Sequence, residues 1–240
     1  NEKVDFLGAS VSYYSTGASA RSLKKYFPEV LGLMADGVKN STFSQEEFDK
    51  EKEVTLENLK STEKNVPAIA GRVQNILVYG KNHPYGEFRS KETVNAITLE
   101  DVKNNYNTYY KPNNAYLIIV GDINPKETKK LVKDLFEGWQ KGEIPTSTYP
   151  APKNLPTSAI SFVNMPNAKQ SEISVINTTD LTLGDKDYYA ALLANKILGG
   201  GGSARLFNNL REDKAYTYGS YSGISQSRED NTATFRATAS

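Results

Sequence analysis

The stretch GGGGSARLFNNLREDKAYTYG, residues 199–219, places four glycines, a charged segment and a tyrosine-rich segment in direct succession. Glycine allows backbone conformations and close approaches that other residues avoid. Residues 203–213 have the pattern of a short helix, and the tyrosines after them are typical of a turn leading into a half-exposed strand. Arg211 precedes Tyr218 by seven residues, a spacing that a helix end followed by a strand does not require.

The glycine run 199–202 could be taken for a phosphate-binding loop, but its surroundings differ from those of such loops. Phosphate-binding glycines follow a strand and open a helix, and a P-loop also carries Gly-Lys-Ser/Thr. Here the glycines follow a helical pattern at 185–198, and no such lysine is present. We therefore expect a flexible hinge or a close approach of two backbone segments.

The composition is that of a globular protein without a strong electrostatic partner. The chain has 240 residues, of which 38% are hydrophobic and 24% charged, and its formal net charge is +1. This charge balance provides no basic surface for nucleic acid or for a membrane. No apolar run approaches the roughly 20 residues that span a bilayer. The absence of cysteine excludes disulfides and thiolate zinc sites.

Helical and strand patterns predict two α+β units, residues 1–139 and 159–240, joined by a proline-rich linker at 140–158. The first reads as the later part of one unit and the second as the earlier part of another, so both units are expected to be incomplete. The expected strands are 9–15, 115–122, 159–165, 171–179, a tyrosine-rich strand and a last strand; the expected helices are 27–38, one around 69–77, 185–198, 203–213, and those that start after Ser44, Thr98 and Asn124.

His83 is the only histidine of the chain and lies in the loop GKNHPYG, residues 80–86. A single histidine in a loop before proline is more often a structural hydrogen-bonding group than a catalyst. A zinc site with two histidines cannot form within this chain. We therefore expect a structural role for His83.

Six carboxylates crowd the helix predicted after Ser44. A solvated face balanced by neighbouring lysines is the ordinary interpretation of such a pattern. The acidic residues are Glu46, Glu47, Asp49, Glu51, Glu53 and Glu57, and the lysines are Lys50, Lys52 and Lys60. Phe48, Thr55 and Leu59 could form the buried stripe of this helix.

Three stretches in this order resemble the pitrilysin/insulinase family of zinc peptidases, which includes the mitochondrial-processing-peptidase type. They are DKEKEVTLENL at 49–59, HPYG followed by YKPNNAYLIIVGD, and the stretch 199–219 quoted above. The resemblance covers essentially the whole chain and implies α+β units with mainly antiparallel sheets backed by helices. It also implies two halves that enclose a chamber. One half binds zinc through an inverted H-x-x-E-H helix, and the other contributes an arginine and a tyrosine.

The resemblance implies that this chain is the half that does not bind metal. The H-x-x-E-H helix would precede the strand near Gly8, outside the sequence in hand. The family's downstream zinc glutamate follows another glutamate by seven residues; Glu51 matches the first, but the second position is Asn58. A neutral amide is a poor zinc ligand, and the adjacent Glu57 lies about 100° around the helix. No metal site is expected in this chain, and zinc is expected in the partner half.

In the family that this chain resembles, the contributed arginine and tyrosine are seven residues apart. Arg211 and Tyr218 match this spacing and are the expected catalytic contributors, whereas Tyr216 does not match it. A tyrosine hydroxyl can donate a hydrogen bond to the carbonyl oxygen that becomes charged during peptide hydrolysis. The arginine fork can hold a substrate carbonyl or carboxylate. Gly200 and Gly201 are expected to contribute to the substrate-binding surface.

Two functions remain open at this point. The first is a non-catalytic, complementing half of a two-part zinc metalloendopeptidase, whose partners are a zinc-binding half and a peptide substrate held by edge-strand pairing. That half would lie in the same longer chain or in a separate subunit. The alternative is a purely structural, proteolytically inactive relative that acts as an assembly subunit. The presence of Arg211 and Tyr218 favours the first.

Overall fold

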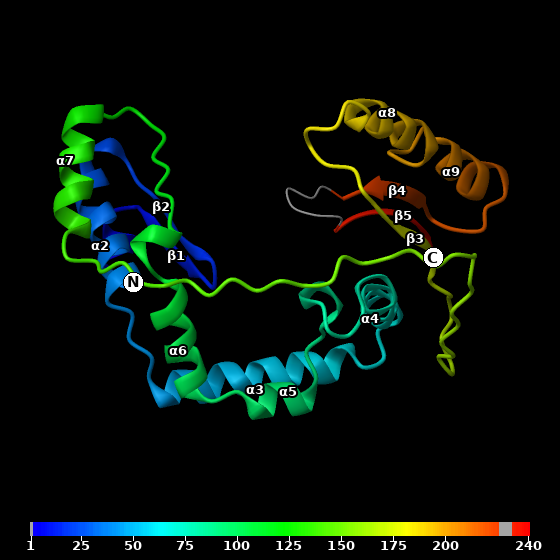
Figure 1. Ribbon diagram of the computed structural model, residues 1–240, viewed down its shortest axis with the longest axis horizontal. Helices are drawn as coiled ribbons and strands as arrows, with labels where there is room; N and C mark the ends of the chain where they lie inside the picture. Colours follow the sequence, from blue (N-terminus) through cyan, green and yellow to red (C-terminus); the bar gives the residue numbers. More distant parts are fainter. Residues whose placement is uncertain (1, 226–231) are drawn as a thin grey trace. The chain divides into compact units, whose positions relative to one another are not determined.

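A computed structural model describes residues 2–225 and 232–240. Residue contacts divide the chain into two compact units, and each unit draws on two separate segments (Figure 1). The first unit contains the residues up to Val54 together with Glu92–Thr146, and the second contains Thr55–Lys91 together with Ser147–Ser240. Each unit contains helices and an antiparallel sheet, in agreement with the predicted α+β class.

The first unit is built on a β-hairpin and the helix that follows it. Strands β1 (Ser10–Tyr14) and β2 (Gly17–Arg21) pair antiparallel, and helix α2 (Phe27–Lys39) packs against β2. The apolar residues of α2 recur at helical spacing, and their burial forms the core of this unit. The most buried of them are Val30, Leu31, Met34 and Ala35. The short helix α1 (Glu2–Phe6) precedes the hairpin.

Three helices start where the sequence predicts them, because a side chain there accepts hydrogen bonds from the free N–H groups of the first turn. Ser44 accepts from Glu47 N at the start of α3 (Gln45–Thr62), and Asn124 caps α7 (Pro125–Phe136). Thr98 and Asp101 form a reciprocal capping box at α6 (Leu99–Tyr109). The hydrogen bonds from the Thr98 side chain and backbone lower the pKa of Asp101.

The predicted buried stripe of α3 is only half-buried. Phe48, Thr55 and Leu59 are of intermediate exposure, and all six carboxylates of the helix are exposed. Lys52 lies on this helix and donates hydrogen bonds to the carbonyl oxygens of Asn95 and Ile97, each at 2.8 Å. Both carbonyls lie at the C-terminal end of helix α5 (Lys91–Ala96). The positive charge of the lysine therefore stabilises the negative end of that helix.

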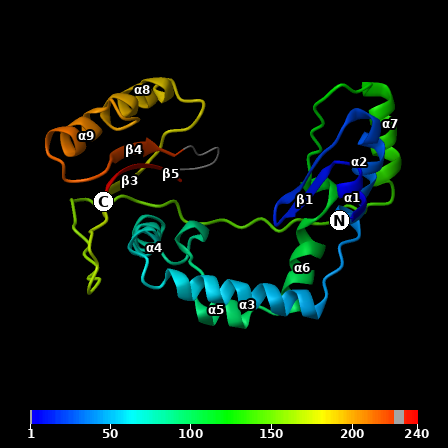
Figure 2. The same ribbon diagram turned by 180° about the vertical axis from the view of Figure 1, so that it is seen from behind.

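The second unit contains a three-stranded antiparallel sheet in the order β3-β5-β4. Its strands are β3 (Ile173–Thr179), β4 (Ser220–Ile224) and β5 (Ala233–Ala239). Helices α8 (Tyr188–Leu198) and α9 (Arg205–Phe207) cover one face, and α4 (Val66–Tyr79) lies on the other (Figures 1 and 2). Gln74 and Asn75 of α4 contact the sheet through hydrogen bonds to Ser174 and Arg236.

Two predicted strands are not formed in this structure. Residues 115–122 and 159–165 have no regular secondary structure and pair with no strand within the described parts of the chain. Most of their apolar side chains are exposed, with Val120 at 92% and Ile160 at 98%. A continuous apolar run favours a strand only where a neighbouring strand supplies the hydrogen-bond partners of its backbone. Conversely, β2 was not predicted because its sequence GASAR has small and polar residues.

The proline-rich segment 140–158 has neither helix nor strand along its length, but it is anchored to the sheet. The Asn154 side chain donates to Thr178 O at 2.9 Å and accepts from Thr178 N at 2.8 Å. The Asn154 amide therefore makes the hydrogen bonds that a neighbouring strand would make at this point of β3, on the edge opposite β5. None of the helices in residues 2–225 and 232–240 is long and apolar enough to cross a membrane.

Asn154→Ala should destabilise the second unit, because it removes the partner of a backbone N–H on a residue that is only 8% exposed. A buried donor left without a partner costs about 1–3 kcal/mol. Urea denaturation followed by circular dichroism measures this loss. Lys153→Ala, at the exposed neighbouring position, is the control. Equal stability of the two variants would show that the Asn154 contact does not contribute.

Candidate functional site

Arg211 and Tyr218 are in direct contact. Arg211 lies on a π-helical turn, η4 (Asn208–Asp213), and its Nη1 donates a 2.7 Å hydrogen bond to the carbonyl oxygen of Tyr218. The phenol of Tyr218 remains 83% exposed, so its hydroxyl is available to another molecule. The hydrogen bond spans the seven-residue separation. With this hydrogen bond in place, the tyrosine ring and part of the guanidinium remain at the surface.

Two further side chains orient the guanidinium of Arg211. Its Cζ lies 4.9 Å from the centre of the Phe207 ring, within the range of a cation–π interaction. Its Nε lies 3.4 Å from a carboxylate oxygen of Glu212. Phe207 was not identified from the sequence, although it precedes Arg211 by four residues, the spacing of neighbours on a helix face. Single π-helical turns occur frequently at functional sites.

The turn that carries Tyr218 is braced by Thr217. Its hydroxyl accepts from Gly219 N at 3.1 Å and donates to Gly219 O at 2.9 Å. Just before it, Ala215 has a φ of 51°, a left-handed conformation that is costly for any residue other than glycine. Tyr216 is 76% exposed, which is close to the exposure of Tyr218. Tyr218 differs from Tyr216 not in exposure but in the hydrogen bond that its backbone carbonyl accepts from Arg211.

The glycine run lies where the end of α8 meets strand β4. Gly199 O accepts a 2.9 Å hydrogen bond from Ser222 N, and a β-carbon on residue 199 would lie 2.4 Å from that nitrogen. At Gly200 a β-carbon would lie 2.7 Å from Lys196 Cα. The expected close approach of two backbone segments is therefore confirmed at Gly199, whereas the close neighbour of Gly200 belongs to the end of α8 just before it. The assignment of Gly200 and Gly201 to a substrate-binding surface stays a prediction.

His83 is a structural residue, as the sequence predicts. It is 7% exposed, and its Nδ1 accepts a hydrogen bond from Tyr85 N at 3.1 Å. Its ring lies against three tyrosine rings, those of Tyr79, Tyr85 and Tyr149, with centroid distances of 5.2, 5.2 and 5.6 Å. This aromatic contact buries the imidazole and ties the 80–86 loop to the second unit.

The positions that correspond to a zinc site carry no ligand cluster. Glu51, Glu57 and Asn58 are exposed on α3. The part of the chain that the structure describes contains no group of three or more His, Cys, Asp or Glu side chains that could hold a metal ion. Around Arg211 the structure places the guanidinium itself, the exposed Tyr218 side chain and the Glu212 carboxylate.

Two family models together match most of the chain. Residues 6–81 match "Insulinase (Peptidase family M16)", and residues 96–240 match "Peptidase M16 inactive domain". The second match contains the complete segment from the glycine run to Tyr218.

Relatives and a solved structure agree with these matches. An uncharacterised zinc protease, YmxG of Bacillus subtilis, is 26% identical over 229 residues, and an uncharacterised zinc protease of Rickettsia felis is 29% identical over 231 residues. Each comparison covers 92% of this chain and 54% of the relative, so the chain spans about half the length of these proteins. The crystal structure of the peptidase M16 inactive domain from Pseudomonas fluorescens superposes with a TM-score of 0.84 at 25% identity, covering 99% of this chain and 58% of that one. The chain therefore belongs to peptidase family M16, the insulinase family, and its residues 96–240 match the inactive domain of that family.

Proposed function

We propose that this chain is the non-metal-binding half of a two-part zinc endopeptidase, and that it contributes Arg211 and Tyr218 to the handling of the peptide substrate. The observation that carries the proposal is the hydrogen bond from Arg211 to Tyr218 O, which holds both residues together on an exposed segment. The matched inactive-domain model supports the assignment to a half without metal.

The chemistry of the two side chains suits peptide hydrolysis. Negative charge develops on the carbonyl oxygen of the scissile bond, and the exposed hydroxyl of Tyr218 would stabilise it by donating a hydrogen bond. Arg211 uses Nη1 for the Tyr218 carbonyl, and its Nη2 has no partner in the described part of the chain. Nη2 can therefore donate to a substrate carbonyl or carboxylate.

The zinc ion belongs, in this proposal, to the partner half. A bound zinc polarises the carbonyl and activates a water molecule for attack. The residues of this chain do not suit that role, because Asn58 replaces the expected glutamate and no ligand cluster occurs in residues 2–225 or 232–240. The relatives are named zinc proteases and are nearly twice as long as the chain, which leaves room for a zinc-binding half in the same polypeptide.

The alternative function is a structural subunit without proteolytic activity. Such a protein would need the fold but not a solvent-facing tyrosine fastened to an arginine. The contact between Arg211 and Tyr218 and the bracing of the turn by Thr217 favour the peptidase half. Kinetics of point variants separate the two functions.

Tyr218→Phe should lower kcat for peptide cleavage about 100-fold, the usual effect of removing one oxyanion donor. The experiment uses the full-length protein or the pair of halves. The melting temperature should barely change, because the ring is retained and the residue is 83% exposed. Arg211→Ala should also raise KM, because the arginine is proposed to hold the substrate in its ground state.

Tyr216→Phe is the matched control, since Tyr216 has nearly the same exposure but lies outside the Arg211 contact. Its turnover should stay near that of the wild type. Full activity of Tyr218→Phe in a pair that cleaves peptides would contradict the proposed role. Absence of cleavage by any complete form would favour the structural alternative.

The 240-residue chain purified alone should contain no stoichiometric zinc, because it has one histidine, no cysteine and Asn58 at the expected ligand position. Elemental analysis after dialysis measures the metal content, with the zinc-binding half as the positive control. One tightly held zinc ion per chain would overturn the assignment to the non-metal half.

A further inference from the structure

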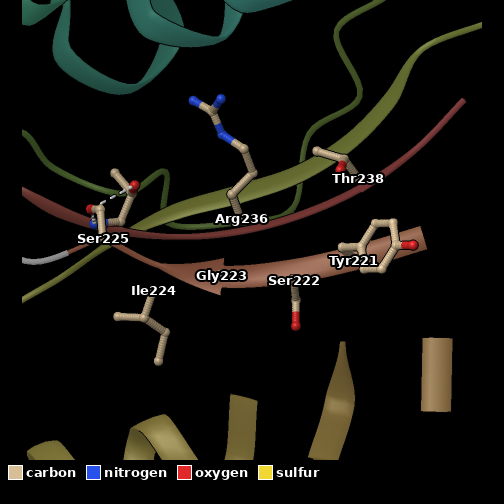
Figure 3. A pocket seen from close by; sticks show the side chains of 8 residues that line it. Tyr221, Ser222, Gly223, Ile224, Ser225, Arg236 and Thr238 are labelled. Carbon is tan, nitrogen blue, oxygen red and sulfur yellow. Dashed lines mark hydrogen bonds between the residues drawn. The ribbon is translucent and has the colours of Figure 1, made fainter. Parts of the chain in front are cut away.

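The α4 face of the three-stranded sheet contains a groove of about 540 Å³ over strands β4 and β5 (Figure 3). Residues directly paired across the two strands share this face, and they form three successive pairs: Tyr221 with Thr238, Gly223 with Arg236, and, just beyond β4, Ser225 with Thr234. The groove is thus a row of hydroxyls with one cation in its middle. Neither the candidate site nor the proposed role of Arg211 uses it.

Arg236 is a half-buried cation without a counter-ion in the described part of the chain. Its side chain rises from the sheet into the groove (Figure 3), and the hydrogen bond recorded for it is a long one of 3.4 Å to Asn75 Oδ1 on α4. The ion pairs of residues 2–225 and 232–240 do not include it. A charge taken partly out of water is costly unless an anion or strong hydrogen bonds compensate it. The free donors of this guanidinium therefore favour an anionic ligand.

The space beside Arg236 is open. Gly223 lies directly opposite it on β4, and a β-carbon on Gly223 would meet no atom within 4 Å. The hydroxyls of Tyr221 and Thr238 have no hydrogen-bond partner among the described residues, whereas Ser225 and Thr234 are bonded to each other at 3.1 Å. The ring of Tyr221 lies back over Gly219, so a ligand above Gly223 would meet the guanidinium fork of Arg236 and, two residues along β5, the free hydroxyl of Thr238. This donor set suits the planar geometry of a carboxylate.

Both outer edges of the sheet are engaged by the chain itself. Asn154 occupies the edge of β3 at Thr178, and the end of α8 occupies the edge of β4 at Ser222 through Gly199 O and the Asn195 side chain. A peptide that approached this sheet as an added strand would have to displace these contacts. The face that carries the groove is open to a ligand without such a displacement.

The groove adjoins the Arg211 segment through Tyr221. The ring of Tyr221 lies 5.7 Å from that of Phe207, and the Arg211 guanidinium lies over the same Phe207 ring. Tyr221 thus lies between the Arg211 segment on the α9 side and the groove on the α4 side, and a peptide that reaches both has to pass it at the end of β4. This adjacency makes a peptide, rather than a free anion, the ligand that the site suits best.

We propose that this groove binds a carboxylate of the peptide substrate, with Arg236 as its counter-ion and with the Thr238 hydroxyl as a further donor. The identification of the ligand as a peptide rests on the proposed function; the preference for a carboxylate rests on the groove alone. The carboxylate is that of an aspartate or glutamate side chain or of the peptide's C-terminus.

Fluorescence anisotropy with the full-length protein tests this site directly. One labelled peptide sequence is prepared with an internal glutamate or glutamine, and each form with a free or an amidated C-terminus. A carboxylate-bearing form should bind about 10- to 100-fold more tightly than the fully neutral form, as expected for hydrogen bonds to a charged group. The form that gains affinity identifies the source of the carboxylate. Arg236→Gln should abolish the difference, and Gly223→Val should weaken binding by filling the groove.

Gln74→Ala is the structural control, because it removes a 2.6 Å contact between α4 and Ser174 without touching Arg236. It should keep the preference for the carboxylate even if it lowers the melting temperature. Equal affinity for charged and neutral peptides, or a preference that survives in Arg236→Gln, would overturn the site, and cleavage by the wild type would still support the proposed function. Carboxylate-dependent binding without any cleavage would instead support the site and contradict the peptidase role.

Discussion

The hydrogen bond from Ser222 N to Gly199 O anchors the segment of the second unit that carries the candidate site. It joins the end of α8 to the edge strand β4, and its short distance leaves no room for a β-carbon on residue 199. Between these two points the chain passes through α9, η4 and the turn that carries Tyr218. Within this segment Arg211 holds the turn through its hydrogen bond to Tyr218 O, and the Tyr218 side chain stays 83% exposed.

The two proposed sites lie on opposite sides of the three-stranded sheet. One face is covered by α8 and α9, which position the Arg211 segment, while the other carries α4 and the groove around Arg236 (Figures 1 and 3). Contacts from Asn154 and Gly199 engage the outer edges, which protects exposed strands from pairing with other chains. The exposed segments and the open part of one face are therefore the surfaces of this sheet that stay accessible.

Sequence patterns predicted the structure well wherever the stabilising contacts lie within a few residues. The capping box of Thr98 and Asp101, the cap at Asn124 and the apolar spacing of α2 are local features, and the helices begin where these features predict. The apolar runs 115–122 and 159–165 were predicted as strands and have no strand partner in the described residues. A strand is stabilised by a neighbour, which an isolated run of apolar residues does not supply.

The order of the residues was enough to establish the family resemblance, the absence of the zinc glutamate at Asn58 and the seven-residue relation between Arg211 and Tyr218. These are properties of spacing along one chain. The tertiary structure alone showed that α4 belongs to the unit of the second sheet and that Arg236 lies opposite Gly223. The physical reason is that strand register and helix packing join residues far apart in the chain, such as Asn75 and Arg236. Such contacts depend on the packing of the whole unit rather than on any local pattern.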